Sequence, residues 1–155
     1  MATNNVQAID VAQYIVDRFY AKQESITTMK LQKLVYYSQA WSLAWECGPL
    51  FDEDFEAWIN GPVVRSLFKA LKGYYYAPMT IPGADVAHLS DDQKDTINRV
   101  LERYGDFTAP ELIALTHADD PWKQARGDLS ESTASEQIIS KDLMANFYSG
   151  LIDEE

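Results

Sequence analysis

The segment 28–46 does most to constrain the fold of this chain. Thr27 or Thr28 can cap a helix at its start, and Gly48-Pro49 can end it. Apolar residues recur between these signals at three- and four-residue spacing: Leu31, Leu34, Val35, Trp41 and Trp45. That period belongs to an amphipathic α-helix, so the sequence predicts a helix over about 28–46.

The segment 50–59 has a different period. Apolar residues alternate with others in its second half, which reads Phe55, Glu56, Ala57, Trp58 and Ile59. This alternation predicts a short strand. Gly61-Pro62 predicts a turn into a helix over about 62–72, with the proline in its first turn. We expect part of the irregular segment 74–89 to pair with the strand as a hairpin, and at least one ring of Tyr74-Tyr75-Tyr76 to be exposed.

Helix signals recur along the rest of the chain. Ser90-Asp91-Asp92-Gln93 and Thr108-Ala109-Pro110-Glu111 are capping boxes, and Asp120-Pro121 combines a cap with a first-turn proline. The helices expected are one over about 5–22, one over about 91–104, a short one after Thr108, another from Asp120 and a last one after Ser140.

These elements predict the fold class. A chain of 155 residues has the length of one domain and can bury a core without a disulfide or a metal. We therefore predict a single, mainly α domain over 1–155, a compact bundle of about seven helices with a small β-hairpin or sheet. Its core is expected over about 6–150, with 151–155 as an acidic tail.

The net charge of −11 is unevenly distributed: residues 1–45 carry +1, 46–90 carry −3, 91–126 carry −3 and 127–155 carry −6. An acidic protein repels nucleic acid and anionic membranes, so neither is an expected partner, whereas a basic protein is. The same charge also serves solubility alone. Cys47, the one cysteine, fits a reducing cytoplasm. Neither a signal peptide nor a membrane-spanning segment is expected.

The segment 116–120 most resembles a catalytic site. His117, with Asp119 and Asp120, could act as a general base or bind a metal, which makes a metal-dependent hydrolase one alternative. No Cys, Ser or second His has the spacing that would complete a nucleophilic set. In the structural interpretation, His117 ends one helix and Asp120 caps the next. We expect no catalysis, no metal and no cofactor.

Trp58 is the strongest candidate for a contact with a partner. If the alternation holds, its ring points away from Ala57 and Ile59, and an exposed tryptophan beside a rigid turn is a good binding anchor. In the alternative interpretation Trp58 packs in the interior, and Gly61-Pro62 only turns the chain.

Four segments together carry a family resemblance. They are Lys30-Leu31-Gln32-Lys33-Leu34-Val35-Tyr36-Tyr37, Gly48-Pro49-Leu50-Phe51, Phe55-Glu56-Ala57-Trp58 with Gly61-Pro62-Val63-Val64, and His117-Ala118-Asp119-Asp120-Pro121-Trp122 with Arg126. Over about residues 6–150 the chain resembles the Panacea-domain family, which includes SocA-like antitoxins and phage-associated relatives.

The resemblance implies a non-catalytic antitoxin of a type II toxin–antitoxin pair, which binds and neutralises a toxin encoded next to it. A proteolytic adaptor that delivers a toxin to a cellular protease is an alternative, as is a phage-derived regulator that binds DNA or a host protein. Self-association stays open. The residues expected at the partner surface are Lys33, Tyr37, Trp58, Val63, Arg65, His117, Trp122 and Arg126. In this set Lys33 and Arg65 would make charged contacts and Trp58 and Tyr37 would be anchors, whereas His117 and Trp122 could instead only stabilise the domain.

Overall fold

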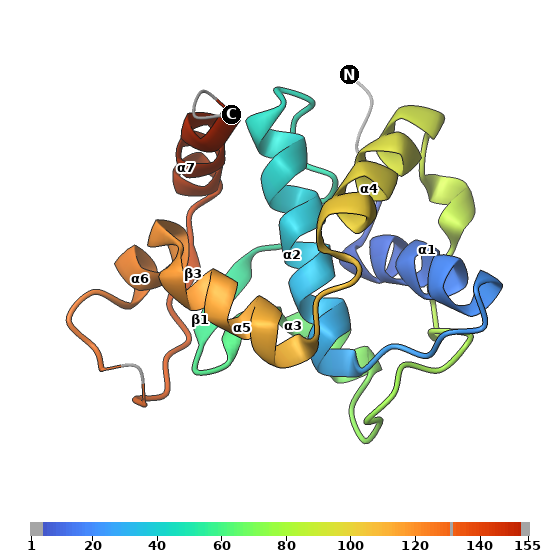
Figure 1. Cartoon of the computed structure of the whole chain (residues 1–155), viewed down its shortest axis with the longest axis horizontal. Coiled ribbons are helices and arrows are strands. Elements are labelled where there is room, and N and C mark those ends of the chain that lie inside the picture. Colours follow the sequence, from blue (N-terminus) through green and yellow to red (C-terminus); the bar gives the residue numbers. More distant parts are fainter. Residues whose placement is uncertain (1–4, 131, 153–155) are drawn as a thin grey trace.

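The protein is built around one buried helix, α2 (Thr28–Ala44), in a computed structural model that describes residues 5–130 and 132–152 (Figure 1). Thr27 caps α2 as expected, because its hydroxyl accepts a hydrogen bond from the backbone N–H of Lys30 at 3.1 Å. Every residue from 31 to 42 is buried. The predicted helix is thus confirmed, but its whole circumference is covered instead of one stripe.

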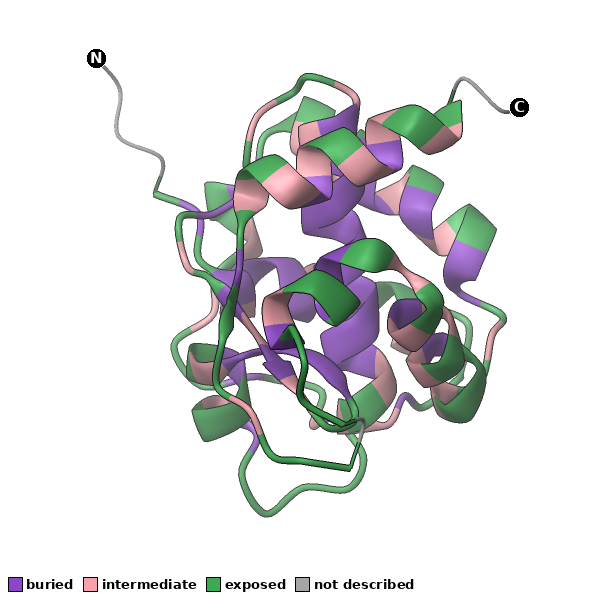
Figure 2. Ribbon diagram, turned by 90° about the vertical axis from the view of Figure 1, so that its left-hand side faces the viewer, coloured by how far each residue is buried: buried purple, intermediate pink, exposed green. Residues whose placement is uncertain are grey.

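The other helices surround α2. α1 (Ala8–Ala21) and α4 (Asp91–Tyr104) pack on one side, and α7 (Lys141–Ile152) packs on the other (Figure 1). The remaining helical elements are α3 (Arg65–Ala70), the 3-10 turn η1 (Val86–His88), α5 (Ala109–Ala118) and α6 (Asp120–Arg126). The mainly α class is confirmed, with seven α-helices in the described part of the chain. Figure 2 shows the buried residues gathered in the interior around α2.

Local helix signals were accurate at most ends. Ser90 with Gln93, and Thr108 with Glu111, form the two predicted capping boxes at the starts of α4 and α5. Two ends differ from the prediction. Asp119, not Asp120, is the N-cap of α6, and α7 continues to Ile152, so the predicted tail from 151 begins inside a helix. Residues 153–155 of that tail lie outside the described residues.

The small sheet has the strand order β2-β1-β3 and is antiparallel throughout. Its strands are β1 (Phe55–Trp58), β2 (Gly61–Val64) and β3 (Ile138–Ile139). The predicted strand is confirmed, but two neighbouring predictions are wrong. The segment 61–64 is a strand instead of the start of a helix, and the partner of β1 is β2 instead of part of 74–89. Tyr76 forms an isolated bridge with Thr27.

Pro62 fits in β2 because of its place in the register. It lies opposite Ala57, whose own N–H donates to Gln137 O at 2.8 Å on the other side of β1. An N–H at position 62 would therefore point away from β1, so the proline costs the sheet no ladder hydrogen bond. Gly61 makes the tight reversal possible through its φ of 105°, which disfavours any other residue.

Three glutamines join helices to backbone groups outside the helices, and the sequence did not predict these contacts. Gln39 on α2 accepts from Leu50 N at 2.7 Å and donates to Phe51 O at 2.8 Å. Gln32 binds both backbone groups of Val64 in the same manner, and Gln13 does so with Ile81 N and Met79 O. A side-chain amide matches one N–H and one C=O at once, so it satisfies backbone groups that no ladder reaches.

Gln39→Leu is expected to lower the free energy of unfolding by about 2 kcal/mol, because it removes the hydrogen bonds of the Gln39 amide to Leu50 N and Phe51 O. Urea denaturation monitored by circular dichroism measures the loss. The matched control is Gln124→Leu on the exposed part of α6, where the change should stay within about 0.5 kcal/mol. Equal losses in the two variants would contradict a structural role for the Gln39 amide.

Candidate functional site

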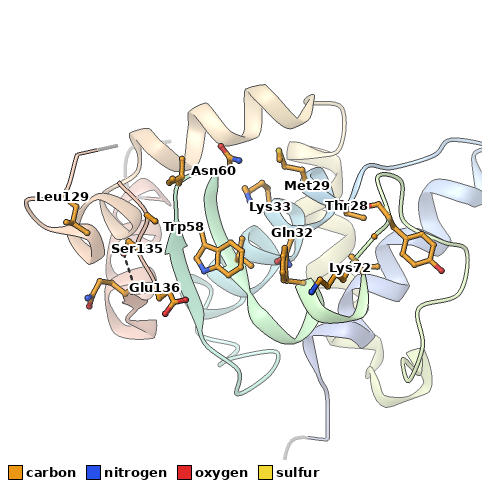
Figure 3. Close-up of a pocket in the computed structure, with 18 residues that line it drawn as sticks. Thr28, Met29, Gln32, Lys33, Trp58, Asn60, Lys72, Leu129, Ser135 and Glu136 are labelled. Carbon is orange, nitrogen blue, oxygen red and sulfur yellow. Dashed lines mark hydrogen bonds between the residues drawn. The ribbon is translucent and has the colours of Figure 1, made fainter. Parts of the chain in front are cut away.

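A groove of about 920 Å³ lies between α2, the β1–β2 hairpin, α3, Leu129 and the segment 134–137 (Figure 3). Ten large apolar side chains are exposed among the described residues, and five of them line this groove: Met29, Ile59, Phe68, Tyr74 and Leu129. The prediction for Tyr74-Tyr75-Tyr76 is confirmed and exceeded, since all three rings are exposed. A surface that concentrates apolar groups in a hollow has the form of a binding site.

Trp58 forms one wall of the groove (Figure 3). It is half-buried, whereas its neighbour Ala57 is fully buried on the opposite face of β1, so the alternation expected from the sequence is confirmed over residues 55–58. The prediction is wrong for Ile59, which follows the strand and is exposed. The Trp58 ring meets the Phe68 ring edge-on, with centroids 4.9 Å apart. Its indole N–H donates to Glu56 Oε1 at 3.0 Å. A pre-oriented ring loses little freedom on binding, which favours its use as an anchor.

Arg65 links the hairpin to the far wall of the groove. Its guanidinium pairs with Glu56 at 2.8 Å and with Glu136 at 3.0 Å. Hydrogen bonding to Arg65 is the main reason why the pKa of Glu56 is lowered. Both ion pairs are at least partly exposed, so they add little stability. Their effect is to orient Glu136 and Glu56, and Glu56 in turn accepts from the Trp58 indole N–H.

Lys33 lies at the floor of the groove. It is 1% exposed, and its ammonium donates to Pro62 O at 3.1 Å. Burial lowers the pKa of Lys33 to about 7. Gly61 covers this side chain closely, because a Cβ at Gly61 would lie 2.7 Å from Lys33 Cε and 2.8 Å from Thr116 Oγ1. Glycine is therefore required at position 61 for two reasons: the turn needs its positive φ, and a larger side chain would collide with Lys33.

A second cluster braces the groove from behind. Trp122 is buried, stacks on His117 with ring centroids 3.9 Å apart, and donates from its indole N–H to Trp58 O at 2.8 Å. Arg126 is also buried and donates to Ala57 O at 2.8 Å and to Ser130 O at 2.7 Å. These contacts fix the backbone of β1 and the start of the segment that forms the far wall.

Asp119 is the centre of a hydrogen-bond network in the interior. Its Oδ2 accepts from the hydroxyls of Tyr37 at 3.0 Å and Tyr148 at 2.7 Å, and the hydroxyl oxygens of Tyr148 and Tyr36 lie 3.3 Å apart. Burial raises the pKa of Asp119. The network joins α2 and α7 to the α5–α6 junction, so the carboxylate has a structural use.

His117, Asp119 and Asp120 of the segment 116–120 each contact different residues. His117 stacks on Trp122, Asp119 accepts from tyrosines, and Asp120 lies 3.6 Å from Lys123. His117 lies in the last turn of α5, as the structural interpretation expects. Residues 5–130 and 132–152 contain no group of three or more His, Cys, Asp or Glu that could hold a metal ion.

The structure divides the eight residues expected at the partner surface into two groups. Lys33, Trp58 and Val63 line the groove, and Arg65 lies beside it, paired with Glu136 from the groove's far wall. The others brace it from the interior: Tyr37, Trp122 and Arg126 are buried, and His117 is half-buried. The sequence did not predict that Met29, Phe68 and Leu129 are exposed in the groove.

Comparison with known proteins identifies the family of this chain. A model described as antitoxin SocA-like, Panacea domain, matches residues 31–123, which extend from α2 into α6. The chain belongs to the SocA-like Panacea domain family. Antitoxin SocA of Caulobacter vibrioides (strain NA1000 / CB15N) is 31% identical over 135 residues, covering 77% of this chain and 72% of that protein. No solved structure matches the chain significantly.

The Panacea domain match contains Lys33, Trp58 and Val63, and it ends before the wall formed by Leu129 and residues 134–137. Among the described helices, none combines the length and the apolar character needed to cross a membrane.

Proposed function

We propose that this Panacea-domain protein is an antitoxin, which neutralises a cognate protein toxin by binding it through the groove and without catalysis. The observation that carries the proposal is the collection of exposed apolar side chains around Trp58 in one hollow. Monomeric proteins rarely leave such a surface uncovered unless it binds something. The family membership and the antitoxin name of the relative supply the kind of partner.

The proposed setting is the cytoplasm, where a lone cysteine stays reduced. The net charge of −11 favours a basic toxin, because opposite charges steer two proteins together at long range. Apolar contacts in the groove would then hold the complex, as the fully desolvated centre of an interface carries most of its affinity.

The test is a growth experiment. The gene next to the one for this protein is expressed under tight control, alone and together with this protein, and the tagged complex is isolated. Arrest by the neighbour alone, with rescue and co-purification in the presence of this protein, supports the proposal. A harmless neighbour that does not co-purify would remove it. The half-life of the toxin in rescued cells separates direct inhibition from delivery to a protease.

Alanine at both Met29 and Phe68 is expected to weaken toxin binding about tenfold to a hundredfold, because both side chains are exposed apolar walls of the groove. Calorimetric titration of the purified partners measures the change. The matched control is Met79→Ala, which removes an apolar side chain that is 66% exposed and lies outside the groove lining. Equal weakening by the control would place the interface elsewhere.

A further inference from the structure

We propose that the groove recognises an Asp or Glu side chain of the toxin, set among apolar residues, and that Lys33 at the groove floor binds this carboxylate. The inference rests on the proposed function and specifies the chemistry of its partner. The net charge of this protein favours a toxin whose surface is basic overall, so such a toxin would have to present an acidic residue at this one place.

The position of Lys33 is the first reason. Its ammonium group has three N–H donors and, among the residues the structure describes, makes one hydrogen bond, to Pro62 O. No carboxylate of the described residues lies within ion-pair distance of it, although its side chain is 1% exposed. Figure 3 shows Lys33 between Met29, Asn60 and Gln32, among the side chains that line the groove. An acceptor group of the partner that enters the groove would satisfy the N–H donors of Lys33 that have no acceptor within residues 5–130 and 132–152.

The charges around the groove are the second reason. Lys33 and Lys72 are its lining cations, and Glu136 is its lining acid. Glu136 is already paired with Arg65 at 3.0 Å. Among the residues that the structure describes, the groove therefore offers two lysines and no free carboxylate, in a protein whose net charge is −11. Charge complementarity at this place selects a negative group.

The apolar walls make this contact selective. Met29, Trp58 and Phe68 exclude water from a segment that fills the groove, and an ion pair gains strength where water is excluded. A carboxamide in place of the carboxylate would accept a hydrogen bond but bring no charge. Burial has already brought the pKa of Lys33 to about 7, so a carboxylate that binds near neutral pH favours uptake of a proton by the amine.

The first test needs no toxin and uses two probes of matched shape, 4-phenylbutyrate and 4-phenylbutanol. Each is titrated into the ¹⁵N-labelled protein at neutral pH while the indole N–H signal of Trp58 is followed. The carboxylate is expected to bind about tenfold tighter than the alcohol in the wild type. In Lys33→Met, which keeps the apolar length of the side chain, the two probes should bind equally.

Three results would overturn the inference: equal or tighter binding of the alcohol, a preference for the carboxylate that survives in Lys33→Met, or no response of Trp58 to either probe. The Trp58→Phe protein identifies the indole signal, and the dispersed amide spectrum of Lys33→Met verifies that this variant is folded.

The second test uses the toxin complex. Lys33→Met should weaken the complex about tenfold or more, and one Asp→Asn or Glu→Gln substitution in the toxin should produce the same loss without adding to it. If wild type and Lys33→Met bind the toxin equally, the inference fails and the proposed function stands. If the neighbouring protein is neither toxic nor bound, the proposed function fails while the probe result still tests Lys33.

Discussion

Replacing Trp122 with alanine is expected to lower the free energy of unfolding by about 4 kcal/mol. The side chain is buried, so its removal leaves a large cavity. The change also removes the stack on His117, the hydrogen bond to Trp58 O and the ring beneath the Arg126 guanidinium, which lies 4.8 Å from its centroid. Urea denaturation of the purified variant measures the loss.

Trp122→Phe serves as the matched control, because phenylalanine keeps one aromatic ring against His117 and loses the indole N–H together with the second ring. We expect a cost of about 1–2 kcal/mol for it, since Trp58 O loses its donor. If alanine costs no more than phenylalanine, the cavity and the stack contribute nothing, and Trp122 would have to act at the protein surface instead. The folded fraction of Trp122→Ala should also bind toxin more weakly, because Trp122 holds the backbone of Trp58.

The helices were predictable because their signals are local. Thr27, Ser90 and Thr108 cap the helices they were expected to cap, since a cap needs only a hydroxyl and the next few residues. The sheet was harder to predict. A Gly-Pro pair fits the start of a helix as well as an edge strand, and only the register with Ala57 and Gln137 decides between them.

The site could be predicted only in part. The alternation in β1 correctly placed Trp58 opposite Ala57, because side chains of a strand alternate between two faces. Lys33 and Tyr37 are buried because other elements pack on every side of α2. The spacing of apolar residues along α2 does not show that its polar face is also covered. The glutamine contacts are likewise long-range: Gln32 reaches Val64 across 32 positions of the sequence.

Lys33 is expected to make stability depend on pH above neutrality. Its pKa is about 7 in the folded protein and near its ordinary value of 10.5 in the unfolded chain. Between these values the unfolded chain holds a proton that the folded protein has released, so the free energy of unfolding rises with pH. Below about pH 7 both states hold the proton, and the cost of burying the charge is fully present. One proton gives a slope of up to about 1.4 kcal/mol per pH unit, and several kcal/mol over the window.

Lys33→Met should be the more stable protein near pH 7 and should lack this rise, because methionine fills the same space without a charge. Chemical denaturation of both proteins at half-unit steps from about pH 7 to about pH 9.5 makes the comparison. The window stops there because burial raises the pKa of Tyr37 and Tyr148, which withdraws stability once tyrosines of the unfolded chain ionise. Equal slopes for the two proteins would show that the Lys33 amine does not titrate in this range. A slope confined to the wild type would show that the free groove contains a largely uncharged amine just above neutral pH, which takes up a proton from the solvent when a carboxylate enters.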